Sequence, residues 1–95
     1  MYSIKELTGI VAKIVSNYHV NKVILVGSYA RNTPTEASDV DLVLDGEDLS
    51  EAYWEILFAL EDQLTVPVDV LTMRGLDGSI LKDSVLKGGV TLYEA

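Results

Sequence analysis

The sequence predicts an α/β (α+β) fold in which a small sheet of three to four strands packs against helices. Segments with apolar residues at helical spacing alternate with short apolar runs along the 95 residues, and turn-forming residues separate them. Such alternation favours helices layered on a sheet. A chain of this length forms one small domain, so we expect residues 1–95 to be a single domain.

A helix is predicted over residues 3–18. Ser3 and Glu6 form a capping-box pattern, which marks the start of a helix. Apolar residues at helical spacing follow and are expected to face the core, namely Leu7, Ile10, Val11, Ile14, Val15 and Tyr18.

Two strands and a short helix are predicted next. Residues 22–26 are expected to form a buried strand, and residues 27–33 a turn that enters a short helix, which stops near Pro34. After a polar loop, residues 39–44 form the second expected strand. Asp45-Gly46 is a typical turn pair and is expected to close it.

A second long helix is predicted after this strand. Asp48 and Glu51 have the spacing of another capping box. The expected core stripe contains Tyr53, Leu57, Leu60 and Leu64. Trp54 and Phe58 lie beside the stripe, where a wide core face is the favoured interpretation and contact with a partner the alternative.

The last third of the chain is expected to hold two strands and one helix. Residues 66–73 read as the third strand, with a proline near its start. A loop is predicted over residues 75–78, a helix over residues 79–87 that ends at a glycine pair, and a final short strand over residues 90–93.

The charge balance limits the classes of partner. Seven basic and 15 acidic residues give a net charge of −8, which repels a phosphate backbone and disfavours stable nucleic-acid binding. A basic protein is the expected partner. There are no cysteines, which excludes disulfides and thiol chemistry. Neither a signal peptide nor a membrane span is apparent, so a soluble, cytoplasmic protein without membrane contact is expected.

Two aspartates stand one residue apart at the start of the second strand. Residues i and i+2 of a strand point to the same face, so Asp39 and Asp41 are expected to present their carboxylates side by side. A hard cation such as Mg²⁺ takes carboxylate oxygens as ligands. The pair therefore predicts a metal site.

A third carboxylate is expected from a neighbouring strand. Asp69 interrupts the apolar run of residues 66–71, where a charged side chain is costly unless it is paired or bound to a metal. Metal ligation is the favoured interpretation. The alternative is a side chain that leans out to solvent at the end of the strand.

The turn after the first strand is a candidate phosphate cradle. Gly27 allows close approach of the backbone, and Ser28 adds a hydroxyl and is expected to cap the short helix that follows. A bare helix cap is the alternative. Arg31 lies one turn into that helix and could bind a phosphate or pair with Asp39 or Glu36, and both interpretations stay open.

These motifs together resemble a known signature. Gly27-Ser28, ten further residues, and then Asp39-Val40-Asp41 are similar to the signature of the DNA polymerase β-like nucleotidyltransferase superfamily. The flanking residues resemble its minimal nucleotidyltransferase (MNT) branch in particular. The resemblance implies a palm-like fold with a mixed sheet. It also implies that Asp39, Asp41 and Asp69 are the metal-binding catalytic carboxylates, with Asp69 also acting as or helping the general base.

The resemblance extends to cofactors and partners. It implies two Mg²⁺ ions, ATP as nucleotide donor, and phosphate contacts from Gly27 and Ser28. Small MNT proteins are typically paired with a helical HEPN ribonuclease toxin. The implied function is an antitoxin that moves AMP from ATP onto a toxin tyrosine within a hetero-complex or oligomer. The alternatives are an antitoxin that only masks its toxin and a transferase acting on a small molecule.

One position departs from the family pattern. The family usually has glycine after the arginine, and this chain has Asn32. Asparagine tolerates a left-handed backbone better than most residues, so the turn is expected to survive.

Overall fold

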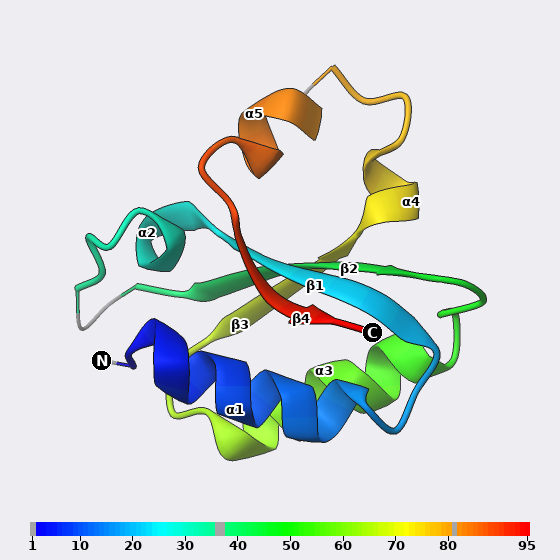
Figure 1. The fold of residues 1–95 in the computed structure, drawn as a ribbon, viewed down its shortest axis with the longest axis horizontal. Coiled ribbons are helices and arrows are strands. Elements are labelled where there is room, and N and C mark those ends of the chain that lie inside the picture. Colours follow the sequence, from blue (N-terminus) through cyan, green and yellow to red (C-terminus); the bar gives the residue numbers. More distant parts are fainter. Residues whose placement is uncertain (1, 36–37, 81) are drawn as a thin grey trace.

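Four strands form one mixed sheet in the computed structural model, which describes residues 2–35, 38–80 and 82–95 (Figure 1). The strands are β1 (Val20–Val26), β2 (Val40–Gly46), β3 (Val68–Thr72) and β4 (Val90–Glu94), in the spatial order β3-β2-β1-β4. β1 runs antiparallel to β2 and β4, whereas β2 and β3 are parallel. The predicted small mixed sheet packed against helices is confirmed.

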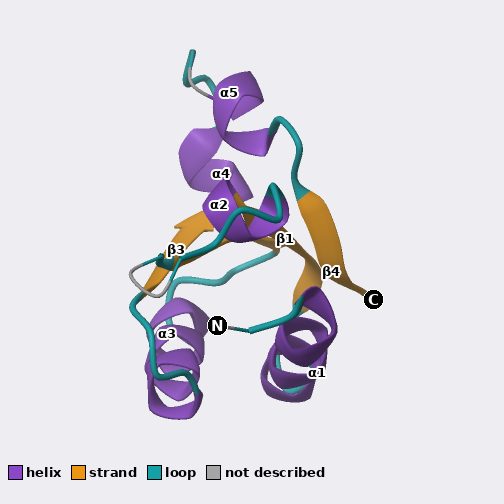
Figure 2. Ribbon diagram, turned by 90° about the vertical axis from the view of Figure 1, so that its left-hand side faces the viewer, coloured by secondary structure: helices purple, strands orange, loops and turns teal. Residues whose placement is uncertain are grey.

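Helices cover the two faces of the sheet unequally. The long helices α1 (Ile4–Val15) and α3 (Ala52–Gln63) lie side by side on one face, and the shorter α2 (Gly27–Ala30), α4 (Met73–Leu76) and α5 (Lys82–Leu86) lie on the other (Figure 2). None of the helices within the described ranges combines the length and the apolar character that crossing a membrane requires.

The alternation of side chains along β2 links the two faces. Val40, Leu42 and Leu44 are fully buried in the main core, which also contains the buried stripes of α1 and α3. Val43 points the other way, into a small cluster with Val26 and Leu76. Because side chains alternate along a strand, Asp41 shares this second face, which is only partly covered by helices.

Helix α1 begins as predicted and ends early. Ser3 Oγ accepts a hydrogen bond from the Glu6 N–H, and Glu6 Oε1 accepts one from the Ser3 N–H, each at 3.0 Å, so the capping box is confirmed. The helix stops at Val15 rather than at residue 18. The Asn17 amide donates to the carbonyls of the last turn, and β1 already begins at Val20.

The predicted turn at Asp45-Gly46 is wrong, because β2 runs through both residues. Asp45 is paired with Lys22, and Gly46 with Val20. A Cβ atom built on Gly46 would lie 2.6 Å from the carbonyl oxygen of His19. The glycine therefore allows close approach of two backbones within the sheet and does not mark its end.

The capping box predicted for the second helix is also wrong. Asp48 adopts a left-handed backbone with φ of 53° and forms part of the turn before the helix. Glu51 precedes the first helical residue and makes no side-chain cap. Inside the helix, Ile56 and Leu60 are fully buried, whereas Tyr53 and Leu57 are only partly buried, so the core stripe is rotated from the predicted one.

The helices in the last third of the chain differ from the predicted ones. Before residue 79 there is a short helix that the sequence does not predict, and after residue 79 the helix is shorter than predicted. The predicted loop begins inside α4, whose first turn is capped by the Thr72 hydroxyl, which accepts from the Gly75 N–H at 3.0 Å. The helix predicted over residues 79–87 is described over Lys82–Leu86, and Leu81 lies outside the described residues.

Candidate metal centre

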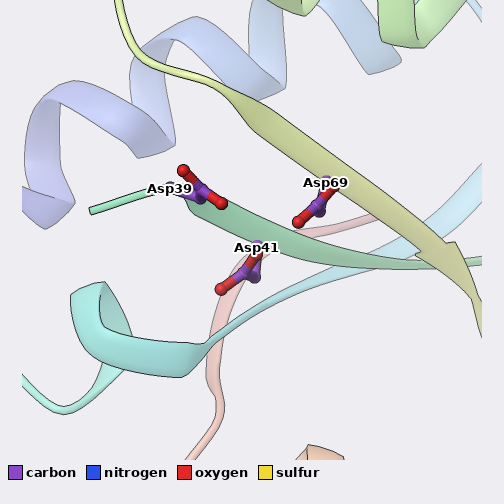
Figure 3. A group of neighbouring side chains, drawn as sticks. All are labelled: Asp39, Asp41 and Asp69. Carbon is purple, nitrogen blue, oxygen red and sulfur yellow. The ribbon is translucent and has the colours of Figure 1, made fainter. Parts of the chain in front are cut away.

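Three carboxylates meet at one end of the parallel strand pair (Figure 3). One oxygen each of Asp39, Asp41 and Asp69 lies within 4.8 Å of the others, and no other group of this kind occurs within the ranges described. Asp41 and Asp69 are directly opposite each other in the register of β2 and β3. Asp39 stands two residues before Asp41. The exposed side chain of Asp69 points toward the other two rather than leaning away into solvent.

The three carboxylates repel one another when no cation lies between them. Burial raises the pKa of Asp41, and the charges of Asp69 and then Asp39 raise it further. Arg31 acts in the opposite direction on this pKa. Three oxygen donors that repel one another and face a partly open surface fit a hard divalent cation such as Mg²⁺, which would replace this repulsion by attraction.

The turn after β1 lies directly against these carboxylates. Val26 pairs with Asp41 across β1 and β2, so Gly27 comes next to the Asp41 side chain. Gly27 has φ of +77°, and a Cβ atom built on it would overlap Asp41 Oδ2. Glycine is thus required both by the left-handed backbone and by the carboxylate beside it.

The role of Ser28 differs from the predicted helix cap. Val26 occupies the N-cap position of α2, and Ser28 lies inside this four-residue helix. Its side chain is half-buried, and its hydroxyl makes no hydrogen bond to any residue that the structure describes, since only its backbone carbonyl accepts one, from Thr33. The hydroxyl is therefore available to a ligand that lies against the turn.

Arg31 is exposed at the end of α2. Within the described part of the chain the one ion pair joins Lys82 to Asp77 at 2.6 Å, so the pairing of Arg31 with Asp39, one of the two interpretations left open, does not form. Glu36, the other predicted partner, lies outside the described residues. The charge of Arg31 nevertheless lowers the pKa of Asp41, and the interpretation of Arg31 as a phosphate ligand stays a prediction.

Asn32 takes the left-handed backbone that its position requires, with φ of 58°. Its N–H donates to the carbonyl of Tyr29 at 3.2 Å, which closes the turn after α2. Replacing Asn32 by Ala is expected to destabilise the protein by about 1 kcal/mol, because most L-residues are strained there, whereas Asn32→Gly should stay within about 0.5 kcal/mol of wild type. Urea unfolding of both variants checks this; equal losses for Ala and Gly would contradict it.

A hollow apart from the carboxylate cluster lies where β2, β3, α4 and the loop before α3 meet. Its volume is about 950 Å³, and Leu71, Arg74 and Tyr53 are among its lining residues. None of the three clustered aspartates lines it. The sequence carries no local signal for this hollow, because four segments far apart in the chain form its walls.

Comparison with known proteins gives two sequence findings. Residues 4–90 match the family described as "Nucleotidyltransferase domain". The chain is also similar to the "Putative protein adenylyltransferase MJ1379" of Methanocaldococcus jannaschii, with 32% identity over 87 residues that cover 86% of this chain and 87% of that protein.

Two solved structures with the same fold are described as toxin–antitoxin assemblies. A crystal structure described as a toxin–antitoxin with AMP-PNP superposes with a TM-score of 0.78 and 25% identity, covering 93% of this chain and 73% of that one. A complex of a tri-AMPylated Shewanella oneidensis HEPN toxin with its MNT antitoxin gives a TM-score of 0.73 at 22% identity, covering 97% and 73%, and shows the shared fold.

Proposed function

This chain belongs to the nucleotidyltransferase domain family, and we propose that it is an antitoxin that transfers AMP from ATP to a tyrosine hydroxyl of a partner HEPN-type toxin. Residues 1–95 would act as one minimal nucleotidyltransferase domain in a Mg²⁺-dependent reaction. The single observation that carries the proposal is the convergence of Asp39, Asp41 and Asp69 directly against the Gly27 turn.

The three aspartates would bind the metal ions, and one of them would also accept the proton of the acceptor hydroxyl. Asp39 and Asp41 would ligate two Mg²⁺ ions, and Asp69 would complete one of the two sites. Bound Mg²⁺ supplies neutralisation of the triphosphate charge and makes the acceptor hydroxyl more acidic. Asp69, which is exposed on the outer strand of the sheet, would accept the hydroxyl proton from an acceptor that arrives from solvent.

The turn after β1 would hold the nucleotide phosphates. The Gly27 backbone and the Ser28 hydroxyl would donate hydrogen bonds to phosphate oxygens, and the exposed Arg31 would add a positive charge. The tyrosine oxygen then forms a bond to the α-phosphorus of ATP. The bond from that phosphorus to the bridging oxygen of the β-phosphate breaks, pyrophosphate leaves with the bonding electrons, and Asp69 takes the proton.

Two comparisons support the choice of donor and acceptor. A relative 32% identical to this chain bears the name of a protein adenylyltransferase, which favours ATP as donor and a protein as acceptor. A structure 25% identical to it is a toxin–antitoxin assembly with an ATP analogue. A non-catalytic antitoxin that masks its toxin is the rival, and the intact set of three converging carboxylates speaks against it.

The test is transfer of label from ATP to the partner. We expect ATP labelled at the α-phosphate, together with Mg²⁺ and a purified HEPN-type protein from the same organism, to label that protein on tyrosine. EDTA should remove the labelling, and excess Mg²⁺ should restore it. ATP labelled at the γ-phosphate is the control, because transfer of AMP leaves that phosphate in the pyrophosphate.

Each other outcome identifies a rival. Equal labelling from α- and γ-labelled ATP would indicate a different reaction. Neutralisation of the toxin without any labelling would favour masking. Labelling of an added small molecule, but not of the protein, would favour a small-molecule transferase.

A further inference from the structure

We propose that the outer face of α3, centred on Trp54 and Phe58, is the surface on which the acceptor protein docks. This inference rests on the proposed function in one respect, namely that the acceptor is a protein. It adds the surface that holds the acceptor and the chemistry that the acceptor must present. Trp54 and Phe58 together are called the aromatic pair below.

The aromatic pair is exposed, although a wide core face was the favoured interpretation of its sequence position. The exposed fractions are 56% for Trp54 and 61% for Phe58. Ile56, Leu60 and Leu64 already fill the core beneath the helix. The two rings lie 6.1 Å apart at a tilt of 33°, and the ring of Tyr53 packs edge-on against Trp54 at 5.1 Å. Large aromatic side chains held in place by neighbours are typical anchors of protein interfaces.

The start of α3 lies at the outer edge of the sheet. The Val40 N–H bonds to the Pro67 carbonyl at 2.9 Å, and carbonyl directions alternate along a strand, so the Val70 carbonyl faces away from β2. The Tyr53 hydroxyl donates to this outward carbonyl at 2.7 Å. Trp54 therefore directly follows a residue whose hydroxyl bonds to the free edge of β3.

Asp69 lies in this same edge strand, but its side chain leaves the sheet on the face opposite α3, beside Asp41. Asp69 directly precedes Val70 in β3, the outer strand next to β2. Ala59 and Gln63 line the groove between α3 and α1, whereas the aromatic pair does not. A protein seated on the pair would thus lie against the side of α3 that faces away from the sheet and outside the groove. A tyrosine of the bound protein would have to extend around the edge strand β3 to the opposite face of the sheet to approach Asp69.

The charge around the pair identifies the chemistry of the occupant. From Asn32 to Met73 the sequence has no lysine, arginine or histidine, and it holds 11 of the 15 acidic residues. Glu51 just before α3 and Glu55 and Asp62 within it are all exposed. A second copy of this chain or an anionic lipid surface would be repelled. The fitting occupant is a protein with an apolar recess bordered by lysine or arginine.

The experiment separates docking from catalysis. Trp54 is the one tryptophan of the chain, so its emission reports directly on whether it is covered. The purified HEPN-type protein, in a variant without tryptophan, is titrated into the wild-type chain and into three variants. Two of them change the aromatic pair, namely Trp54→Phe with Phe58→Ser, and Trp54→Ser with Phe58→Ser, which is called the double serine variant. The third, Ile80→Ser, is the control. Ile80 is 96% exposed in the loop between α4 and α5. Binding of all variants is followed by calorimetry, and transfer of AMP by labelled ATP.

We expect the Trp54 emission to shift to shorter wavelength on binding. The double serine variant should raise the acceptor Kd and the acceptor KM by about 30-fold or more, with kcat at saturating acceptor within about twofold of wild type. Ile80→Ser should leave both constants within about twofold. Added salt should weaken binding of the wild-type chain.

Other results overturn the proposal. One is an unchanged acceptor Kd in the double serine variant, and another is a loss of kcat in that variant without a change of KM. The third is a dimer of this chain, seen by light scattering, that is lost in the double serine variant but not in Ile80→Ser. If the wild-type chain binds through the pair but transfers no label, the proposed function fails while the docking surface stands. If it transfers label and the double variant has an unchanged KM, the reverse holds.

Discussion

Replacement of Asp39 and Asp41 together by asparagine is expected to reduce transfer of AMP by about 1,000-fold or more while the fold persists. Asparagine keeps the size of the side chain but removes two of the three anionic oxygens that converge at the end of β2 and β3. Several kcal/mol of transition-state stabilisation then disappear, and each 1.4 kcal/mol corresponds to a factor of about ten in rate. The measurement is label transfer from α-labelled ATP at saturating acceptor.

The same variant should be more stable than the wild-type chain when no metal is present. Burial and the neighbouring carboxylates raise the pKa of Asp41, so its ionised form destabilises the folded state above that pKa. As the pH falls through the raised pKa, the wild-type side chain takes up a proton and this penalty is lost. The variant should therefore gain most in Tm near neutral pH, and its advantage should shrink on acidification.

Addition of Mg²⁺ should reverse the order of stability. A ligand that binds only the folded state raises its stability by mass action, so Mg²⁺ should raise the Tm of the wild-type chain and leave that of the variant nearly unchanged. The control replaces Asp83 by asparagine and Glu94 by glutamine, which removes two exposed charges elsewhere. If this control loses transfer to the same degree, the effect belongs to net charge and not to the cluster.

The position of the metal-binding residues was largely predictable from local rules. The alternation of side chains in a strand brings Asp39 and Asp41 together, and the cost of a lone charge in an apolar run singles out Asp69. What local rules could not supply is the register. Turn signals do not reveal that β2 and β3 run parallel with Asp41 opposite Asp69, because that pairing depends on the long α3 crossover.

The incorrect predictions share one cause, which is that short motifs serve more than one purpose. Asp45-Gly46 has the composition of a turn, yet Gly46 is glycine because the backbone of His19 passes close to it. Asp48 and Glu51 have the spacing of a capping box, yet Asp48 is used for its left-handed backbone. For Gly46 a contact distant in sequence decided between two roles that the local pattern allows, and for Asp48 the left-handed backbone of the turn did.

The aromatic pair also shows that a local pattern does not decide whether a residue is buried. Helical spacing places Trp54 and Phe58 next to the core stripe, and hydrophobicity alone favours burial. The fully buried residues of α3 are Ile56 and Leu60, however, and not the predicted Tyr53 and Leu57. At about 100° per residue, Trp54 and Phe58 lie on the side of the helix opposite Ile56. The rotation of the buried stripe, which the sequence pattern does not state, leaves the two aromatic residues outside.

Replacement of Gly27 by alanine is expected to lower transfer by about 100-fold. The added Cβ would overlap Asp41 Oδ2, so either the carboxylate or the turn must move. A displacement on the order of 1 Å in a catalytic group costs about 100-fold in rate. Because Gly27 also has φ of +77°, the variant should lose about 1–2 kcal/mol of stability from backbone strain in addition to the clash.

A matched glycine separates these two effects. Gly78 has nearly the same backbone, with φ of +81°, and a Cβ atom built on it would meet no atom within 4 Å. Gly78→Ala should therefore show the loss from backbone strain alone, with transfer of AMP near the wild-type rate. Urea unfolding and label transfer are measured on both variants. If Gly27→Ala were no worse than Gly78→Ala in transfer, then the contact between the turn and Asp41 would not position the carboxylate, and the phosphate cradle and the metal centre would have to be regarded as separate features.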